Sequence, residues 1–335
     1  MNTSFIAALA AARHAAIGVS AKDPIFQREK LTVYRYRPIA RPAAAAPILI
    51  VYALVNRPYM LDLQPDRSLI RGLLSAGLDV HLIDWGHPNG ADRFTSLEDY
   101  LESQMHDCVD AVLRATSAPS LNLLGVCQGG TFSVCYTALH PERIRNLVTM
   151  VTPIDFQTPA DLLSKWVRRV DLAAWIGEGN VAGETMNRVF LSLMPFRLLQ
   201  QKYVNLLAET PDARRLENFV RMERWISDSP DLAGAALREF ATWFYQENRL
   251  IKGTLQIGER LVDLGSLRQP ILNLYGKRDH LVPPAASAAL EHLTASSDYS
   301  GHELDLGHIG MYVSDRAQRQ VPALIADWLT CKHRR

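Results

Sequence analysis

Short, mainly apolar segments recur through the first half of the chain and constrain its fold more than any other feature. They lie at residues 48–52, 79–83, 121–124 and 147–151, and a segment long enough for a helix separates each from the next. Strands that are apolar on both faces must be covered on both faces, as in parallel sheets whose crossover connections are helices. The sequence therefore predicts an α/β fold with a mostly parallel sheet and helices on both faces.

The third apolar segment leads directly into Gly125-Val126-Cys127-Gln128-Gly129, and the residues that follow are expected to be helical. A strand, a sharp turn flanked by glycines and a helix make the nucleophile elbow of the α/β-hydrolase fold, here with cysteine where serine is usual. Glycines suit this turn because the nucleophile has a strained backbone and larger neighbours would clash with the strand and the helix. Cys127 is the predicted nucleophile. The alternative is a structural cysteine, since a free cysteine commonly packs as a small hydrophobic residue.

Two later segments continue the chain order of an α/β-hydrolase triad, which is nucleophile, acid, histidine. The apolar segment 271–276 ends shortly before Asp279, so this carboxylate would lie at the carboxyl end of a strand, where it can orient an imidazole. His308 lies between Gly307 and Gly310, ahead of a predicted helix over 315–329. We predict Asp279 as the acid and His308 as the base.

Four other polar residues compete for these roles. His280 is adjacent to Asp279 but would point the opposite way on an extended backbone, so we assign it a supporting hydrogen bond. His302 precedes the loop of the predicted base, and we expect it to be structural. Asp84 and Asp305 are alternative acids, but neither follows the strand that the triad order requires.

A cysteine–histidine pair works through the thiolate, which the imidazole favours or generates, and its acyl-enzyme is a thioester. The oxyanion that forms during attack needs two backbone N–H donors. One is expected from Gln128, which follows the nucleophile, and the other from the loop after segment 48–52. Leu54 and Val55 are the nearest candidates in that loop. The sequence does not choose between them, and Val55 is our working candidate.

The chain divides into four predicted parts. Residues 1–45 form an N-terminal segment with one edge strand, which the alternation of apolar and polar residues over 31–37 predicts. Residues 46–155 and 249–335 form the two parts of the α/β-hydrolase core. Residues 156–248 are helical in composition and rich in aromatics, and an insertion between core strands indicates a cap over the site. We expect most of its aromatic side chains to be packing residues.

Composition and charge exclude several other classes of protein. The chain has 36 basic and 35 acidic residues, a net charge of +1, so nothing indicates a nucleic-acid surface. The cysteines, at positions 108, 127, 135 and 331, have neither disulfide nor zinc spacing, and Cys108 and Cys135 are expected in the core. No apolar run approaches the roughly 20 residues of a membrane span. The Ala-rich residues 5–13 lack a basic start, so we expect a short amphipathic helix there and no secretory signal.

Motifs over most of the chain resemble one family. They are residues 49–59 with Asp62-Leu63, LIDWG at 82–86, GVCQGG at 125–130, VTPIDF at 151–156, DHLVPP at 279–284 and GHIG at 307–310. Taken together, these motifs are similar to those of the catalytic subunit of class III polyhydroxyalkanoate synthases. The short chain also resembles the class III subunit more than the longer class I and class II enzymes.

The resemblance implies an acyltransferase that polymerises 3-hydroxyacyl-coenzyme A, usually 3-hydroxybutyryl-coenzyme A, into polyester and releases coenzyme A. The family's nucleophile, acid and histidine fall on Cys127, Asp279 and His308, and Asp279 is also implied to help activate the attacking 3-hydroxyl. Acyl-coenzyme A is then a substrate and no cofactor is expected. The resemblance further implies an accessory subunit and a cytoplasmic location on polyester granules, and leaves open a homodimer.

Two alternatives of other kinds remain at this stage. A cysteine-dependent hydrolase of esters, lactones or thioesters would share the same triad and acyl-enzyme, so the local motif does not separate it from a synthase. A catalytically silent binding protein on the same fold is the second alternative, and the presence of all three catalytic residue types argues against it.

Overall fold

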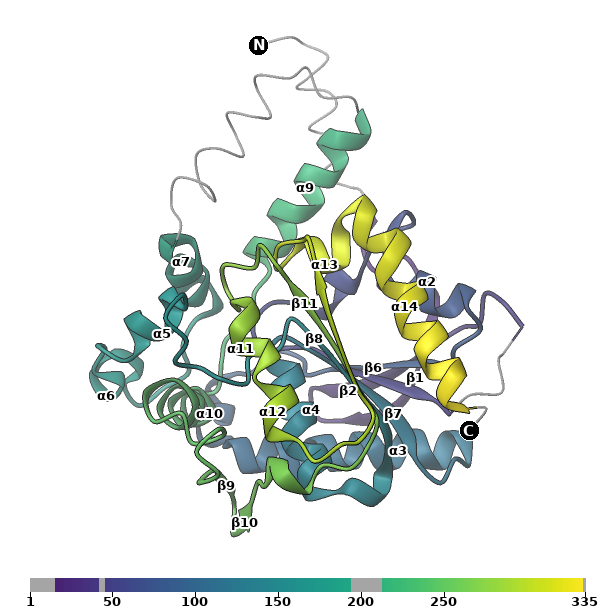
Figure 1. The fold of residues 1–335 in the computed structure, drawn as a ribbon. Coiled ribbons are helices and arrows are strands. Elements are labelled where there is room, and N and C mark those ends of the chain that lie inside the picture. The colour runs from purple at the N-terminus through teal and green to yellow at the C-terminus, as the bar shows by residue number, and fades with distance from the viewer. Residues whose placement is uncertain (1–15, 42–45, 194–212, 334–335) are drawn as a thin grey trace, which may run out of the picture.

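The computed structural model describes residues 16–41, 46–193 and 213–333, and its centre is a sheet of eight strands (Figure 1). The order across the sheet is β1-β2-β6-β3-β7-β8-β11-β12. The β1–β2 and β2–β6 pairs are antiparallel and the other pairs are parallel, which confirms the predicted α/β fold. The strands are β1 (Lys22–Arg28), β2 (Leu31–Tyr36), β3 (Ile48–Val51), β6 (Val80–Asp84), β7 (Leu121–Val126), β8 (Ile144–Met150), β11 (Ile271–Gly276) and β12 (Tyr299–Leu304).

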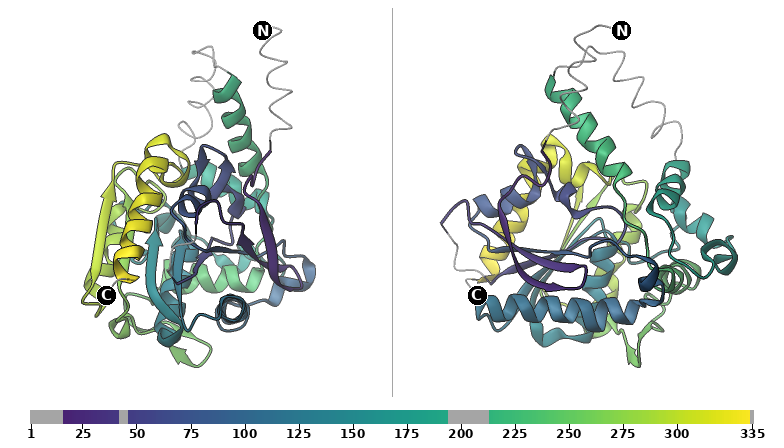
Figure 2. Two further views of the ribbon diagram at one scale, coloured as in Figure 1. Left: turned by 90° about the vertical axis from the view of Figure 1, so that its right-hand side faces the viewer. Right: turned by 180° about the vertical axis from the view of Figure 1, so that it is seen from behind.

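Helices cover both faces of the sheet, as the apolar segments require (Figures 1 and 2). All residues of β3 are buried: Leu49 and Val51 pack in the core cluster that includes α3 and α4, and Ile48 and Ile50 in the one that includes α2 and α14. The covering helices are α2 (Leu69–Ser75), α3 (His106–Thr116), α4 (Gln128–Leu139), α11 (Pro284–Ala288), α12 (Leu290–Leu293), α13 (Gly310–Val313) and α14 (Asp315–His333).

The prediction of a single edge strand in the N-terminal segment is wrong, because the segment contains two strands. β1 and β2 form an antiparallel hairpin, so β1 is the edge and β2 lies inside it. β1 escaped detection because it contains Pro24 and buries no residue fully, so it has no alternating apolar pattern. Proline is tolerated on an edge strand because the unpaired side needs no N–H donor. The helix predicted over residues 5–13 lies outside the described residues.

Shorter elements connect the core. The connecting loops contain two small two-stranded sheets, β4–β5 and β9–β10. These elements are η1 (Pro58–Leu61), β4 (Asp62–Gln64), β5 (Arg67–Ser68), η2 (Gly90–Phe94), η3 (Asp99–Met105), η4 (Pro141–Arg143), β9 (Gln256–Ile257), β10 (Arg260–Leu261) and η7 (Leu264–Ser266).

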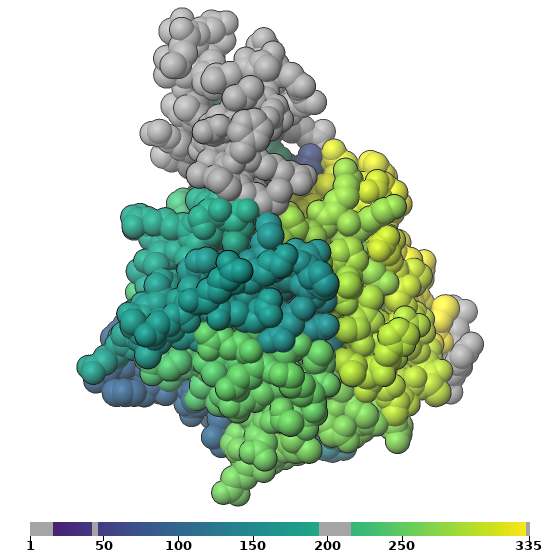
Figure 3. Space-filling model, turned by 60° about the vertical axis from the view of Figure 1, so that its left-hand side comes forward, coloured from purple at the N-terminus to yellow at the C-terminus, as the bar shows by residue number. Residues whose placement is uncertain are grey.

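The segment predicted as a cap is helical in its described part. It comprises α5 (Leu162–Val167), α6 (Leu172–Ile176), α7 (Gly183–Leu193), α9 (Ala213–Ser227), α10 (Gly234–Phe240) and η6 (Ala241–Gln246). A small core of its own includes Val167, Leu172 and Ile176. Figure 3 shows the first part of this segment, α5 to α7 in teal, beside the yellow-green C-terminal part of the chain on one face. Ala236, Phe240 and Phe244 belong to the core cluster that includes α3 and α4, so α10 and η6 of the insertion pack on the core.

Candidate active site

Cys127 lies in the turn between β7 and α4, with φ of 56° and ψ of −126°. A positive φ is unfavourable for a residue with a side chain, so neighbouring contacts must hold it. The Cys127 N–H donates to the Met150 carbonyl at 2.9 Å, and the Cys127 carbonyl accepts from the N–H groups of Gly130 and Thr131 at 2.9 and 3.3 Å. The side chain is half-buried and lines a cavity. This is the geometry of a nucleophile elbow.

The positions around Cys127 must be glycines because neighbouring atoms lie too close to leave room for a side chain. A Cβ atom on Gly129 would lie 2.2 Å from the Val51 carbonyl oxygen, and one on Gly125 would lie 2.4 Å from the Gly130 Cα. A Cβ atom on Gly130, which follows the motif, would lie 1.8 Å from Oγ1 of Thr152. The turn can thus approach β3 and β8 only because these positions carry no side chain.

His308 and Asp279 meet at the carboxyl ends of the strands. The Nδ1 atom of His308 lies 2.7 Å from Oδ2 of Asp279, and both side chains are buried. The other carboxylate oxygen of Asp279 accepts from the N–H groups of Leu281 and Val282, each at 2.9 Å. Because these bonds fix the carboxylate, its bond to Nδ1 sets the orientation of the ring and turns Nε2 away from Asp279.

The electrostatics couple His308 to Cys127 as well. Burial has the largest single effect and lowers the pKa of His308, but the charges of Asp279 and Cys127, with hydrogen bonds to both, together raise that pKa to about 10. A protonated imidazole beside the sulfur favours the thiolate, which is the nucleophilic form of cysteine. The three residues predicted from separate parts of the chain therefore lie at one site, with His308 bonded to Asp279 and lining the same cavity as Cys127.

The two candidates for the second oxyanion donor differ in the structure. The N–H of Leu54 donates to Oε1 of Gln128 at 3.0 Å, so it is already engaged. Val55 lines the cavity together with Cys127 and Gln128. The Gln128 side chain has a role that the sequence did not reveal, because only the fold brings it against the loop after β3.

The competing residues lie elsewhere or have other partners. Asp84 pairs with Arg57 at 3.3 Å, and Asp305 pairs with Arg278 at 2.9 Å. His302 is exposed on β12 at the edge of the sheet. His280 lines the cavity, and the supporting hydrogen bond that we expect for it stays a prediction.

A mostly apolar cavity of about 210 Å³ lies between the core and the cap. Cys127 and His308 line it from the core, and the cap contributes aromatic and aliphatic side chains, namely Leu163, Trp166, Val167, Leu172, Trp175, Met186, Val189, Phe190, Leu191, Trp225, Ile226, Leu232, Leu237, Phe240, Ala241 and Tyr245. Apolar side chains around a thiol lower the amount of water that can reach it. Some cap aromatics thus line the site instead of only packing the cap.

Two buried tyrosines beside the triad were not predicted from the sequence. Tyr52 follows β3 and Tyr312 lies in α13; their side chains interact with each other, and both line the cavity. The ring of Tyr312 also packs edge-on against His308, with centroids 6.2 Å apart. No local pattern marks either tyrosine, because the two are far apart in the sequence.

Across residues 16–41, 46–193 and 213–333, we find no cluster of three or more histidine, cysteine or carboxylate side chains arranged to hold a metal ion. Among the helices of those same residues, none combines the length and the apolar character that crossing a bilayer would require.

Comparison with known families matches two family models. The model for the α/β hydrolase fold matches residues 46–315, and the model for the N-terminus of poly-beta-hydroxybutyrate polymerase (PhaC) matches residues 14–73. Among solved structures, the fold is similar to a monoacylglycerol lipase from Paleococcus ferrophilus, with a TM-score of 0.56 at 18% identity over 90% of this chain and 99% of the lipase. A thermophilic esterase from Thermogutta terrifontis gives a TM-score of 0.54 at 17% identity over 94% of this chain and 100% of the esterase. Both structures support the fold alone.

Much closer relatives are known by sequence. The poly(3-hydroxyalkanoate) polymerase subunit PhaC of Allochromatium vinosum is 51% identical over 93% of this chain and 89% of its own length. The subunits of the same name from a Synechocystis strain and from Thiocystis violacea are each 48% identical, over 94% and 93% of this chain and 85% and 88% of their own lengths. The chain therefore belongs to the PhaC family of poly(3-hydroxyalkanoate) polymerase subunits, within the α/β-hydrolase fold, as its motifs predict.

Proposed function

We propose that this protein polymerises short-chain 3-hydroxyacyl-coenzyme A, such as 3-hydroxybutyryl-coenzyme A, into polyester through a thioester on Cys127. The observation that carries the proposal is the geometry of the site: His308 is bonded to Asp279 at 2.7 Å and lines one cavity together with Cys127, which lies in the elbow. Its family relatives are named as poly(3-hydroxyalkanoate) polymerases, which supports this substrate class. No cofactor enters the proposed reaction.

In the first half-reaction, the Cys127 sulfur attacks the thioester carbonyl of the substrate. A new bond forms between the sulfur and the acyl carbon, the bond to the coenzyme A sulfur breaks, and the departing thiolate takes the proton held by His308. The N–H groups of Gln128 and Val55 are our candidates for stabilising the oxyanion in between. Cysteine suits this exchange because one thioester replaces another at little energetic cost.

In the second half-reaction, a 3-hydroxyl oxygen attacks the acyl carbon on Cys127. The ester bond forms, the bond to the Cys127 sulfur breaks, and His308 takes the hydroxyl proton, which restores the thiolate–imidazolium pair. Water competes with the hydroxyl for the acyl-enzyme, and the apolar cavity under the cap limits that competition. Asp279 orients His308 throughout and is a candidate to assist hydroxyl activation.

Partners and location belong to the same proposal. Relatives carry the name of a polymerase subunit, which supports an accessory subunit for this chain too. We further propose that the protein works in the cytoplasm on the surface of polyester granules, where its insoluble product accumulates. Size-exclusion chromatography with and without substrate would determine whether the active form is a homodimer.

The test incubates purified protein with 3-hydroxybutyryl-coenzyme A, alone and with a candidate accessory subunit, and follows thiol release, insoluble polyester and free acid together. Polyester with thiol release would support the synthase, and free acid alone would indicate a cysteine hydrolase instead. Cys127→Ala should abolish thiol release. Cys108→Ala and Cys135→Ala are the controls, because both cysteines are fully buried in the core and should leave turnover intact.

A second variant examines Asp279. If Asp279 helps to activate the hydroxyl, then Asp279→Asn should slow elongation more than acylation of Cys127. Single-turnover release of coenzyme A measures acylation, and polyester yield over time measures elongation. An equal loss in both steps would limit Asp279 to orienting His308.

A further inference from the structure

The loop that follows β3 carries Val55, our candidate for the second oxyanion donor. In this loop Asn56 has a φ of 64°, in the left-handed region, so the chain bends sharply directly after Val55. Hydrogen-bond donors of an oxyanion hole must be held to within fractions of an ångström. The contacts that hold the loop on either side of Val55 therefore bear on catalysis.

On the side facing the core, two side chains hold the loop. The Gln128 side chain accepts the N–H of Leu54 at 3.0 Å, directly before Val55. The Trp85 indole N–H donates to the carbonyl of Tyr52 at 2.9 Å. The part of the loop before Val55 is therefore hydrogen-bonded to the nucleophile elbow and to the segment that follows β6.

On the other side, the loop is held by the cap. The Trp225 indole N–H, on α9, donates to the carbonyl of Arg57 at 2.8 Å, and Trp225 is buried. The hydroxyl of Ser229, just beyond α9, donates to Oδ1 of Asn56. Both residues directly after Val55 thus have a hydrogen-bond partner in the cap.

The segment with these two anchors is bound firmly to the rest of the cap. Asn187 on α7 donates to the carbonyl of Ile226, and its own Oδ1 lies 2.9 Å from the Ser229 hydroxyl. Gly183, at the start of α7, packs so closely that a Cβ atom there would lie 2.2 Å from the Ser229 carbonyl oxygen. A displacement of α7 and α9 would therefore move the anchors as well.

We propose that Trp225 and Ser229 are positioning residues through which the cap sets the second oxyanion donor. The inference rests on the proposed function, since it concerns thioester attack by Cys127. On this proposal, the position of the cap and the assembly of the oxyanion hole are coupled. When α7 and α9 pack against the loop, they hold Asn56 and Arg57. The N–H of Val55 is then directed at the reacting carbonyl. Neither anchor needs to take part in the chemistry.

The test compares Ser229→Ala and Trp225→Phe with the unchanged protein in steady-state release of coenzyme A. Each variant removes one hydrogen-bond donor, and Trp225→Phe keeps an aromatic ring at the buried position; we expect kcat to fall about 10- to 100-fold with KM changed by less than about threefold. Ser227→Ala is the matched control, because among the described residues the Ser227 hydroxyl bonds only to carbonyls of its own helix, α9. It should keep the kcat of the unchanged protein to within about twofold.

Alkylation of Cys127 by iodoacetamide separates the oxyanion hole from the nucleophile. This reaction needs the thiolate but forms no oxyanion, so its rate should be the same in both anchor variants and the unchanged protein. Unchanged kcat in both variants would overturn the inference, and so would a parallel loss of alkylation, which would place the effect on the triad or the fold. Absence of thiol release from the unchanged protein would instead remove the proposed function.

A double variant tests the Asn56–Ser229 contact itself. Asn56→Gly removes the acceptor, and glycine adopts a positive φ without strain. If the two side chains act through one hydrogen bond, adding Ser229→Ala to Asn56→Gly should lower kcat little further, and additive losses would contradict the link.

Discussion

At the scale of single residues, the site depends on charges that are buried together. His308 would lose its proton readily if burial acted alone, and it keeps the proton because Asp279 and Cys127 are adjacent. Asp279 in turn is held by two backbone N–H groups, so it remains available as a fixed carboxylate. In the proposed reaction, the reactivity of Cys127 is therefore a property of the group and not of the cysteine alone.

This leads to a prediction on the reactivity of Cys127. Asp279→Asn removes the charge that raises the pKa of His308, so the imidazolium and with it the thiolate should be less populated near neutral pH. The rate of iodoacetamide alkylation at about pH 6.5 should fall several-fold, and raising the pH should restore it. The unchanged protein serves as the reference at each pH. A pH-independent rate in Asp279→Asn would contradict this account.

A second residue-scale prediction concerns the glycine that follows Gln128. Gly129→Ala would place a Cβ atom 2.2 Å from the backbone of Val51, which cannot move without shifting β3. We expect a loss of about 1–3 kcal/mol or more in the free energy of unfolding, measured by urea denaturation. Gly90→Ala is the control, since a Cβ atom there would meet nothing within 4 Å. Equal stabilities for the two variants would contradict the close approach.

At the scale of elements, the start of helix α5 shows how the cap tolerates a buried charge. Asp161 caps this helix by accepting the N–H of Ser164 at 2.8 Å, and its side chain is almost fully buried. Burial has the largest effect and raises the pKa of Asp161 to about 6, while its backbone hydrogen bonds act in the opposite direction. The carboxylate is thus ionised at neutral pH at a cost to the stability of the cap.

The raised pKa predicts a pH-dependent effect of Asp161→Asn. Asparagine keeps the capping oxygen but has no charge. Because the folded state binds the Asp161 proton more tightly than the unfolded state, the contribution of Asp161 to stability falls as the pH rises from about 4 to about 6. Asp161→Asn should therefore raise the free energy of unfolding by on the order of 1–3 kcal/mol above pH 7 and change it little near pH 4. Calorimetry at both pH values measures this, and destabilisation at both would contradict it.

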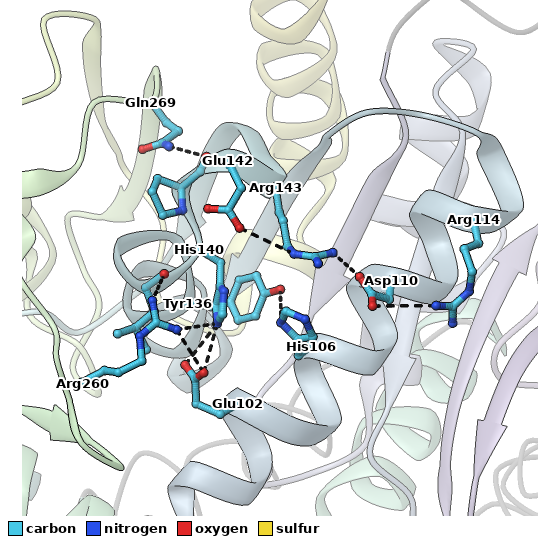
Figure 4. A network of polar contacts seen from close by, with 12 residues as sticks. Glu102, His106, Asp110, Arg114, Tyr136, His140, Glu142, Arg143, Arg260 and Gln269 are labelled. Carbon is cyan, nitrogen blue, oxygen red and sulfur yellow. Dashed lines mark hydrogen bonds and ion pairs between the residues drawn. The ribbon is translucent and has the colours of Figure 1, made fainter.

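At the scale of the whole molecule, a polar network joins segments on either side of the cap insertion (Figure 4). His140, just after α4, lies 3.2 Å from the carboxylate of Glu102 in η3, and Arg260 in β10 lies 3.2 Å from the same carboxylate. Arg260 also donates to the carbonyl of Leu139. The segment that follows the cap is therefore hydrogen-bonded to helices that lie more than a hundred residues earlier in the chain.

His140 makes this network sensitive to acid. Burial, the largest effect, lowers the pKa of His140, and the charges of His106 and Arg260 lower it further against the opposing charge of Glu102. The unfolded state therefore binds the His140 proton more tightly than the folded state does. As a result, the contribution of His140 to the free energy of unfolding falls as the pH drops below about 6.5. His140→Gln should reduce the loss in unfolding free energy between about pH 7.5 and about pH 5.5, with His302→Gln on an exposed strand as the control. An unchanged pH dependence would contradict this.

Much of the fold and of the candidate site follows from local sequence. Apolar segments such as β3 and β7 must be buried on both faces, and glycines beside Cys127 allow the sharp turn, so a parallel sheet with an elbow could be predicted. The chain order of Cys127, Asp279 and His308 then indicated which residues would meet. β1 could not be predicted because an exposed edge strand has no apolar pattern to detect.

Only the tertiary structure decided which groups contact one another across the chain. It engages the N–H of Leu54 with Gln128, pairs Tyr52 with Tyr312, and places Trp225 and Ser229 of the cap on the loop beside Val55. A strand or a turn is determined by neighbours in sequence, whose sterics and solvation act locally. A contact between residues far apart in the chain depends on how whole layers pack, and no local pattern records it.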